Sequence, residues 1–179
     1  MLDEFDRLRG QNMPGMITGK PIILGGSLGR LEATGRGVVI TILEAVKRLG
    51  LNPWGLTASI QGFGNVGSMT ARFLHEQGIK VIAVNDALGG VFKEEGLDIP
   101  ALLTFSRETG TVAGFPGARP LRGNELFAVP ADIFVPAALE NQITDETAPL
   151  LQAKIVAEAA NGPTSSEGDQ ILREKGSFV

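Results

Sequence analysis

The chain has 179 residues, of which 43% are hydrophobic and 20% charged, so it can bury a core and is not disordered. Its formal net charge of −4 argues against nucleic acid as a main partner, and the absence of cysteine excludes a disulfide framework and a thiolate metal site. No apolar run reaches membrane-spanning length and residues 1–20 are charged rather than signal-like, so we expect a cytoplasmic protein without a membrane partner.

The first part of the chain contains two helix patterns separated by a loop. Apolar residues recur at helical spacing between residues 2 and 8, which predicts a short amphipathic helix. The Gly- and Pro-rich stretch 12–29 is typical of a loop. Apolar residues 38–49 again follow the helical period, and Gly50 is a typical helix terminator.

A glycine-rich turn follows the β-compatible residues 57–60 and precedes a helix pattern. Gly62, Gly64 and Gly67 form a G-x-G-x-x-G pattern. The first glycine permits a tight turn, the second lets a pyrophosphate approach the backbone, and the third lets the helix pack close to the sheet. Because free N–H groups and the helix dipole at a helix start favour phosphate, the pattern predicts a dinucleotide site.

The next apolar run, residues 80–84, ends in Asn85 and Asp86. Asp86 lies 19 residues after Gly67, near the roughly 20-residue offset of an acid that binds an adenosine ribose. A carboxylate there accepts hydrogen bonds from the ribose hydroxyls and repels a 2′-phosphate. We therefore predict NAD as the cofactor, in preference to NADP.

Beyond Asp86, strand and helix patterns alternate. Residues 91–92 follow a Gly-Gly turn and predict a short strand, and a helix is expected from Ile99 with Asp98 as its N-cap. The stretch 111–123 has no regular pattern. Two buried strands are predicted at 132–135 and 154–157, then a final helix capped by Ser165 or Ser166, and the first residues of another strand at 178–179.

The order of these elements predicts the fold class. Alternating strands and helices are typical of an α/β fold, here a Rossmann-like doubly wound, mostly parallel sheet with helices on both faces. We predict that residues 1–179 form a single NAD-binding domain.

The remaining chemistry-bearing residues predict no further site. No His, Asp and Glu residues cluster at metal-ligand spacing, so we predict no metal site. The only histidine, His75, lies about two turns from the phosphate end of its helix, where a surface position is the ordinary interpretation. Lysines mostly fall at element ends or on polar faces, so no residue of the chain is assigned a catalytic role.

Several segments of the sequence together match one protein family. They are residues 18–21, 25–30, 33–37, 61–67, 135–138 and 160–164, with sequences TGKP, GGSLGR, ATGRG, QGFGNVG, VPAA and ANGPT. Nearly the whole chain resembles the cofactor-binding domain of glutamate dehydrogenase. Leucine and phenylalanine dehydrogenases share this layout, but segments 33–37 and 161–164 look more like the glutamate branch.

The resemblance implies roles for individual residues. In the family, the residue matching Thr34 lies by the nicotinamide carboxamide, and the one matching Asn161 lies close to the nicotinamide. Asp86 matches the ribose-binding acid, while Ala138 and Gln142 match further cofactor contacts. The cofactor-binding residues predicted in this way and from the Gly-rich turn are Thr34, Gly62, Phe63, Gly64, Asn65, Val66, Gly67, Asp86, Ala138, Gln142 and Asn161. Two small departures from the family pattern are Ala159, where Gly is usual, and Ser165, where a second Thr is usual.

The resemblance also implies what the sequence does not contain. The family has an N-terminal domain with substrate-binding and catalytic lysines and an essential aspartate, and a further strand with an Asn-Ala-Gly-Gly segment after the position of Val179. The parent reaction is oxidative deamination of L-glutamate to 2-oxoglutarate and ammonia, by an enzyme that is a homo-hexamer in the family. We expect this chain to bind the cofactor without turnover, as a monomer or weakly self-associating domain.

Two other functions stay open from the sequence. The chain fits a stand-alone dinucleotide-binding module without chemistry, and it fits the cofactor domain of a dehydrogenase for another amino acid. The family's substrate pocket lies mostly in its N-terminal domain, so the sequence does not choose between substrates.

Overall fold

The computed structural model describes all residues 1–179 and divides into two compact units, Met1–Ala33 and Thr34–Val179. The first unit contains the predicted helix, α1 (Leu2–Arg9), followed by loop with two 3-10 turns, η1 (Pro14–Met16) and η2 (Ile22–Leu24). The layers of sheet and helix lie within the second unit. A single dinucleotide-binding domain over residues 1–179 stays a prediction.

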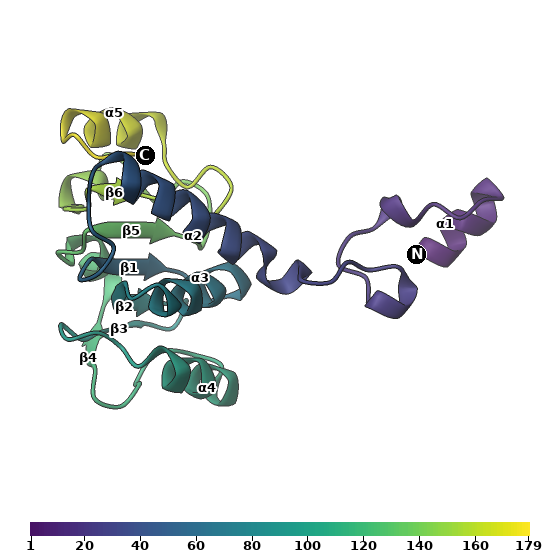
Figure 1. The fold of residues 1–179 in the computed structure, drawn as a ribbon, viewed down its shortest axis with the longest axis horizontal. Coiled ribbons are helices and arrows are strands. Elements are labelled where there is room, and N and C mark those ends of the chain that lie inside the picture. The colour runs from purple at the N-terminus through teal and green to yellow at the C-terminus, as the bar shows by residue number, and fades with distance from the viewer. The chain divides into compact units, whose positions relative to one another are not determined.

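A six-stranded sheet organises the second unit (Figure 1). In spatial order the strands are β4 (Arg119–Leu121), β3 (Gly90–Phe92), β2 (Lys80–Asn85), β1 (Thr57–Gln61), β5 (Ile133–Pro136) and β6 (Ile155–Val156). Strand β1 pairs in parallel with β2 and β5, and β5 pairs in parallel with β6, whereas β3 pairs antiparallel with both β2 and β4. The mostly parallel α/β fold is therefore confirmed.

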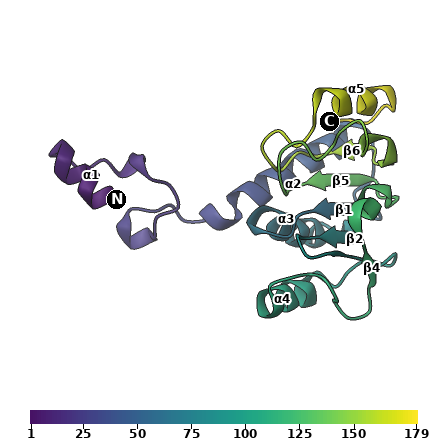
Figure 2. The ribbon, with the colours of Figure 1, turned by 180° about the vertical axis from the view of Figure 1, so that it is seen from behind.

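Helices cover both faces of this sheet. One core combines the apolar sides of α2 (Arg30–Arg48), α3 (Asn65–Glu76) and α4 (Ile99–Thr109) with strand residues such as Ile60 and Val135. The second core lies on the other face and joins Phe134 and Val156 to α5 (Ser166–Glu174), η3 (Gly123–Ala128) and η4 (Ala148–Leu150). Figure 2 shows the sheet from behind, with the arrows of β1, β2 and β5 running in one direction.

Helix α2 begins earlier than the apolar period predicts, and it contains two glycines. Gly35 is required there because a Cβ would lie 2.7 Å from Met69 Cβ and 2.9 Å from Thr70 N of α3. The absence of a side chain lets α2 and α3 pack in close contact. Residues 119–121, which had no predicted structure, form β4, where Pro120 is tolerated because the strand lies at the edge of the sheet.

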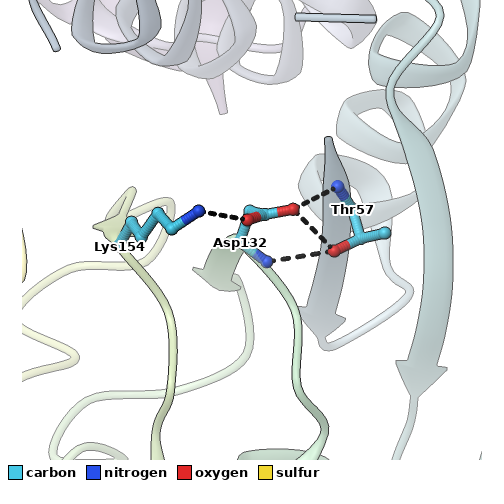
Figure 3. Close-up of polar contacts among 3 residues, drawn as sticks. All are labelled: Thr57, Asp132 and Lys154. Carbon is cyan, nitrogen blue, oxygen red and sulfur yellow. Dashed lines mark hydrogen bonds and ion pairs between the residues drawn. The ribbon is translucent and has the colours of Figure 1, made fainter. Parts of the chain in front are cut away.

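The amino-terminal edge of the parallel strands is joined by one carboxylate (Figure 3). Asp132 Oδ2 accepts hydrogen bonds from Thr57 N and Thr57 Oγ1, both at 3.0 Å, and Asp132 Oδ1 lies 3.0 Å from Lys154 Nζ. These residues precede or begin β5, β1 and β6. Burial by itself raises the pKa of Asp132, but the hydrogen bonds from Thr57 and Lys154 outweigh it and hold that pKa below its ordinary value.

Candidate functional site

The Gly-rich turn connects β1 to α3 at the carboxyl edge of the sheet. Gly62 has a φ of +90°. It packs against the connection that follows β5, because a Cβ on Gly62 would lie 3.0 Å from Ala138 Cα. Gly67 packs on Gly62, since its Cβ would collide with the Gly62 carbonyl oxygen. The first and third glycines of the pattern therefore serve close packing of the turn, as predicted for the third.

Gly64 differs from its two neighbours in the pattern. It is exposed, and a Cβ on it would have no atom within 4 Å. Gly64 is also the N-cap residue of α3, and no side chain caps the first turn of this helix. The start of α3 therefore presents uncapped backbone N–H groups beside open space, which is the arrangement that binds phosphate.

The side chains of Phe63 and Val66 point into the core. The Phe63 side chain is only 8% exposed and belongs to the core under α2 and α3, against which Val66 also packs. Their side chains consequently hold the turn in place. Asn65, by contrast, is exposed at the first position of α3.

Asn85 fixes the turn from the neighbouring strand. Gly62 N donates to Asn85 Oδ1 at 2.9 Å and to Asn85 O at 3.1 Å, so both the side chain and the main chain of Asn85 hold Gly62. The side chain of the next residue, Asp86, accepts bonds from two loops. Asp86 Oδ1 accepts from the turn before β3, and Asp86 Oδ2 from Thr111 and Val112 after α4.

A polar network joins β1 to the two loops after β5 and β6. Gln61 Nε2 donates to Gln142 Oε1 at 2.8 Å, although the two residues are 81 apart in sequence. Gln142 N donates to Pro163 O at 2.7 Å, which places the segment after Asn161 beside Gln142. Two buried polar atoms in this region, Gln61 Oε1 and Thr164 Oγ1, have no hydrogen-bond partner in the chain.

The structure brings most of the predicted cofactor residues to one edge of the sheet. Gly62 to Gly67, Ala138, Gln142 and Asn161 all lie in connections that leave the carboxyl ends of β1, β5 and β6. Asp86 leaves β2 at the same edge. Thr34 does not belong to these loops but lies in α2. It is next to Gly35, the glycine that contacts Met69 of α3.

Three residues with a part in this arrangement were not predicted from the sequence. Gln61 and Asn85 are the last residues of β1 and β2, and Thr111 lies in the loop after α4. The position of a polar residue at the carboxyl end of a parallel strand is a signal for Gln61 and Asn85. Thr111 has no such signal, because its partner Asp86 is 25 residues away.

Other candidate residues lie outside this edge. His75 is exposed in the last turn of α3, and Lys20 Nζ donates to the carbonyls of Pro14 and Ile17, as a loop-stabilising lysine does. Lys175 Nζ donates to carbonyls around η4. No group of three or more His, Cys, Asp or Glu residues could hold a metal ion, and no helix is long and apolar enough to cross a membrane.

A family model described as Glutamate/Leucine/Phenylalanine/Valine dehydrogenase matches residues 25–179. The chain belongs to this family. Among curated relatives, the cryptic catabolic NAD-specific glutamate dehydrogenase of Bacillus subtilis is 49% identical over 175 residues, which cover 98% of this chain and 41% of that protein. The NAD-specific glutamate dehydrogenase of Staphylococcus aureus is 47% identical over 176 residues, 98% of this chain and 42% of that protein.

Solved structures of this dehydrogenase family have the same fold. The hetero-hexameric glutamate dehydrogenase of Thermus thermophilus superposes with a TM-score of 0.89 at 34% identity, over 98% of this chain and 41% of that one. The glutamate dehydrogenase of Peptoniphilus asaccharolyticus gives a TM-score of 0.76 at 40% identity, over 98% of this chain and 40% of that one. The chain thus spans about two fifths of the length of its dehydrogenase relatives.

Proposed function

We propose that this chain is the NAD-binding domain of a glutamate dehydrogenase and binds the cofactor at the carboxyl edge of β1, β2 and β5. The observation that carries the proposal is the open face of Gly64 above the uncapped start of α3. A pyrophosphate placed there meets backbone N–H groups and the positive end of the helix dipole, with no side chain in its way.

The polar groups around this position fit a dinucleotide. A buried polar atom without a hydrogen-bond partner costs about 1–3 kcal/mol, so the unpaired Gln61 Oε1 and Thr164 Oγ1 favour a ligand or ordered water close to them. Gln61 bonds to Gln142 through its side-chain amide, and Thr164 follows Asn161 in the loop whose Pro163 O accepts from Gln142 N. This supports a cofactor that extends from the Gly-rich turn toward the loops after β5 and β6.

Each predicted residue then has a role in binding. The main chain of Phe63 to Val66 holds the pyrophosphate, Asp86 faces the adenosine ribose, and Ala138 lines the connection beside Gly62. Gln142 and Asn161 lie on the loops beyond, and Thr34 on α2 is proposed to lie by the nicotinamide carboxamide. The bound cofactor would supply the hydride acceptor, while the residues of this chain bind and orient it.

The substrate and assembly of the parent enzyme are proposed from its relatives. The curated relatives at 47–49% identity are NAD-specific glutamate dehydrogenases, and one solved relative is a hetero-hexamer. We propose oxidative deamination of L-glutamate by a cytoplasmic, hexameric parent. This chain spans about two fifths of the length of those relatives, and we propose that the parent's substrate residues lie mostly in the remainder.

Calorimetric titration of the chain with NADH and with NADPH tests this proposal. We expect NADH to bind at least about fivefold more tightly, because a charge near a 2′-phosphate costs about 1 kcal/mol or more. Asp86→Asn removes that charge and should reduce the ratio of NADH affinity to NADPH affinity. Equal or tighter binding of NADPH by the unaltered chain would contradict the role of Asp86, and failure to bind either cofactor would contradict the site.

A further inference from the structure

The carboxylate of Asp86 has no free acceptor position in the chain. A carboxylate offers about four lone-pair positions. Asp86 Oδ1 accepts from Leu88 N at 2.8 Å and Gly89 N at 3.2 Å. Asp86 Oδ2 accepts from Thr111 Oγ1 at 2.7 Å and Val112 N at 2.6 Å. A ribose diol can therefore bond to this carboxylate only by displacing a donor that is already there.

The loop after α4 is held firmly beside the turn before β3. Val112 is completely buried, and a Cβ on Gly89 would lie 3.2 Å from Ala113 Cβ. Movement of the whole loop would break the core contact of Val112 as well as its bond to Asp86. Displacement of a single donor is consequently the less costly route to a free acceptor position.

The four donors differ in how easily they can be displaced. A backbone N–H has a fixed direction, and those of Leu88 and Gly89 form the turn that Asp86 itself closes. The Thr111 hydroxyl hydrogen can rotate toward solvent, because Thr111 is only half-buried. Rotation leaves intact the bond that Thr111 Oγ1 accepts from Ala113 N at 3.0 Å. The Thr111 hydroxyl is therefore the donor that a ribose hydroxyl replaces at least cost.

We propose that Thr111 is a specificity-determining residue, whose hydroxyl competes with the adenosine ribose for Asp86. This inference rests on the proposed NAD site. Each cofactor that bonds to Asp86 must displace the Thr111 hydroxyl, so the affinity for a ribose diol is lower than the carboxylate alone would give. Removal of the hydroxyl frees one acceptor position and favours the cofactor with the complete diol.

Thr111→Val tests the inference because it keeps the branched side chain and removes only the hydroxyl. We expect calorimetric titration to show about three- to tenfold tighter NADH binding, corresponding to part of one hydrogen bond to a charged group. NADPH, whose 2′ oxygen carries a phosphate, should gain less, so the selectivity ratio rises. Thr111→Ser keeps the donor and should bind both cofactors as the unaltered chain does.

Two further measurements keep the test decisive. Thr41→Val removes an exposed hydroxyl that bonds Val38 O within α2, and it should leave both affinities unchanged. Thermal unfolding without cofactor shows whether each variant is folded, and Thr111→Ala replaces Thr111→Val if the latter is not. Unchanged or weaker NADH binding by the folded variant would overturn the competition. If the unaltered chain binds neither cofactor, the proposed NAD site fails, and this inference fails with it.

Discussion

A Cβ atom on Gly62 would lie 2.8 Å from the carbonyl oxygen of Ala137, the residue that follows β5. Gly62 also has a φ of +90°, which side-chain-bearing residues rarely adopt. Gly64 has a φ of −78° and open space where its side chain would be. The same short pattern thus contains one glycine that the fold requires and one whose open face is left for a ligand.

Gly64→Val should abolish cofactor binding while the fold stays intact. The valine Cβ has no atom of the chain within 4 Å, and the branched side chain occupies the space proposed for the pyrophosphate. Circular dichroism and thermal unfolding should match those of the unaltered chain, and calorimetry with NADH should show no binding. Native-like folding together with unchanged NADH affinity would place the phosphate site elsewhere.

Gly62→Ala should destabilise the fold itself. The methyl group collides with the Ala137 peptide, and the positive φ adds strain, so we expect a loss of about 2–4 kcal/mol in the free energy of unfolding. Urea unfolding measures this loss, with Gly64→Ala as the matched control. Equal unfolding midpoints for the two alanine variants would contradict the distinction between the glycines.

The Asp132 carboxylate should make the stability of the chain depend on acid. Its pKa in the folded state is lowered, so its contribution is present above the ordinary value of 3.8 and is lost as the pH falls through the folded-state pKa. Asp132→Asn should cost about 1–2 kcal/mol at pH 7 and less at pH 3. Urea unfolding, followed by the fluorescence of the only tryptophan, Trp54, measures the difference in unfolding free energy between Asp132→Asn and the unaltered chain at each pH. A difference that does not shrink in acid would exclude this linkage.

A polypeptide of residues 1–179 should not oxidise glutamate. Three of its lysines are engaged, Lys20 and Lys175 with carbonyls and Lys154 with Asp132. Without a bound and oriented substrate, the reaction loses the advantage of holding substrate and cofactor together, which is worth on the order of 7–11 kcal/mol. The assay is NADH production at high protein concentration, with a full-length relative as the positive control. A rate that survives repurification and disappears in Asn161→Ala would contradict this expectation.

The local patterns of the sequence predicted the elements around the Gly-rich turn, because glycine spacing and apolar period act over short distances. Asp98 and Ser165 also cap α4 and α5 as their positions indicated, with side chains that accept from Ala101 N and Gly168 N. The beginning of α2 was not predicted, because glycine is a poor helix former and the contact of Gly35 with α3 forms only in the folded chain.

The polar connections of the candidate site could not be predicted in the same way. Gln61 meets Gln142, and Asp86 meets Thr111, only after strands distant in sequence have paired. The sequence predicted that Asp86 is an acceptor, but it did not show how many donors of its own chain already occupy the carboxylate. That number depends on the path of the loop after α4, for which residues 111–113 have no regular pattern.

The pairing of β1 with β5 has a consequence for synthesis on the ribosome. Thr57 at the start of β1 bonds to Asp132, which is made 75 residues later. Until β5 has emerged, β1 has only β2 beside it, and the open strand edge carries Ala58 and Ile60, both completely buried in the finished fold. We therefore expect nascent chains that stop before residue 136 to aggregate or to bind chaperones, and the sheet to close only when β5 becomes accessible.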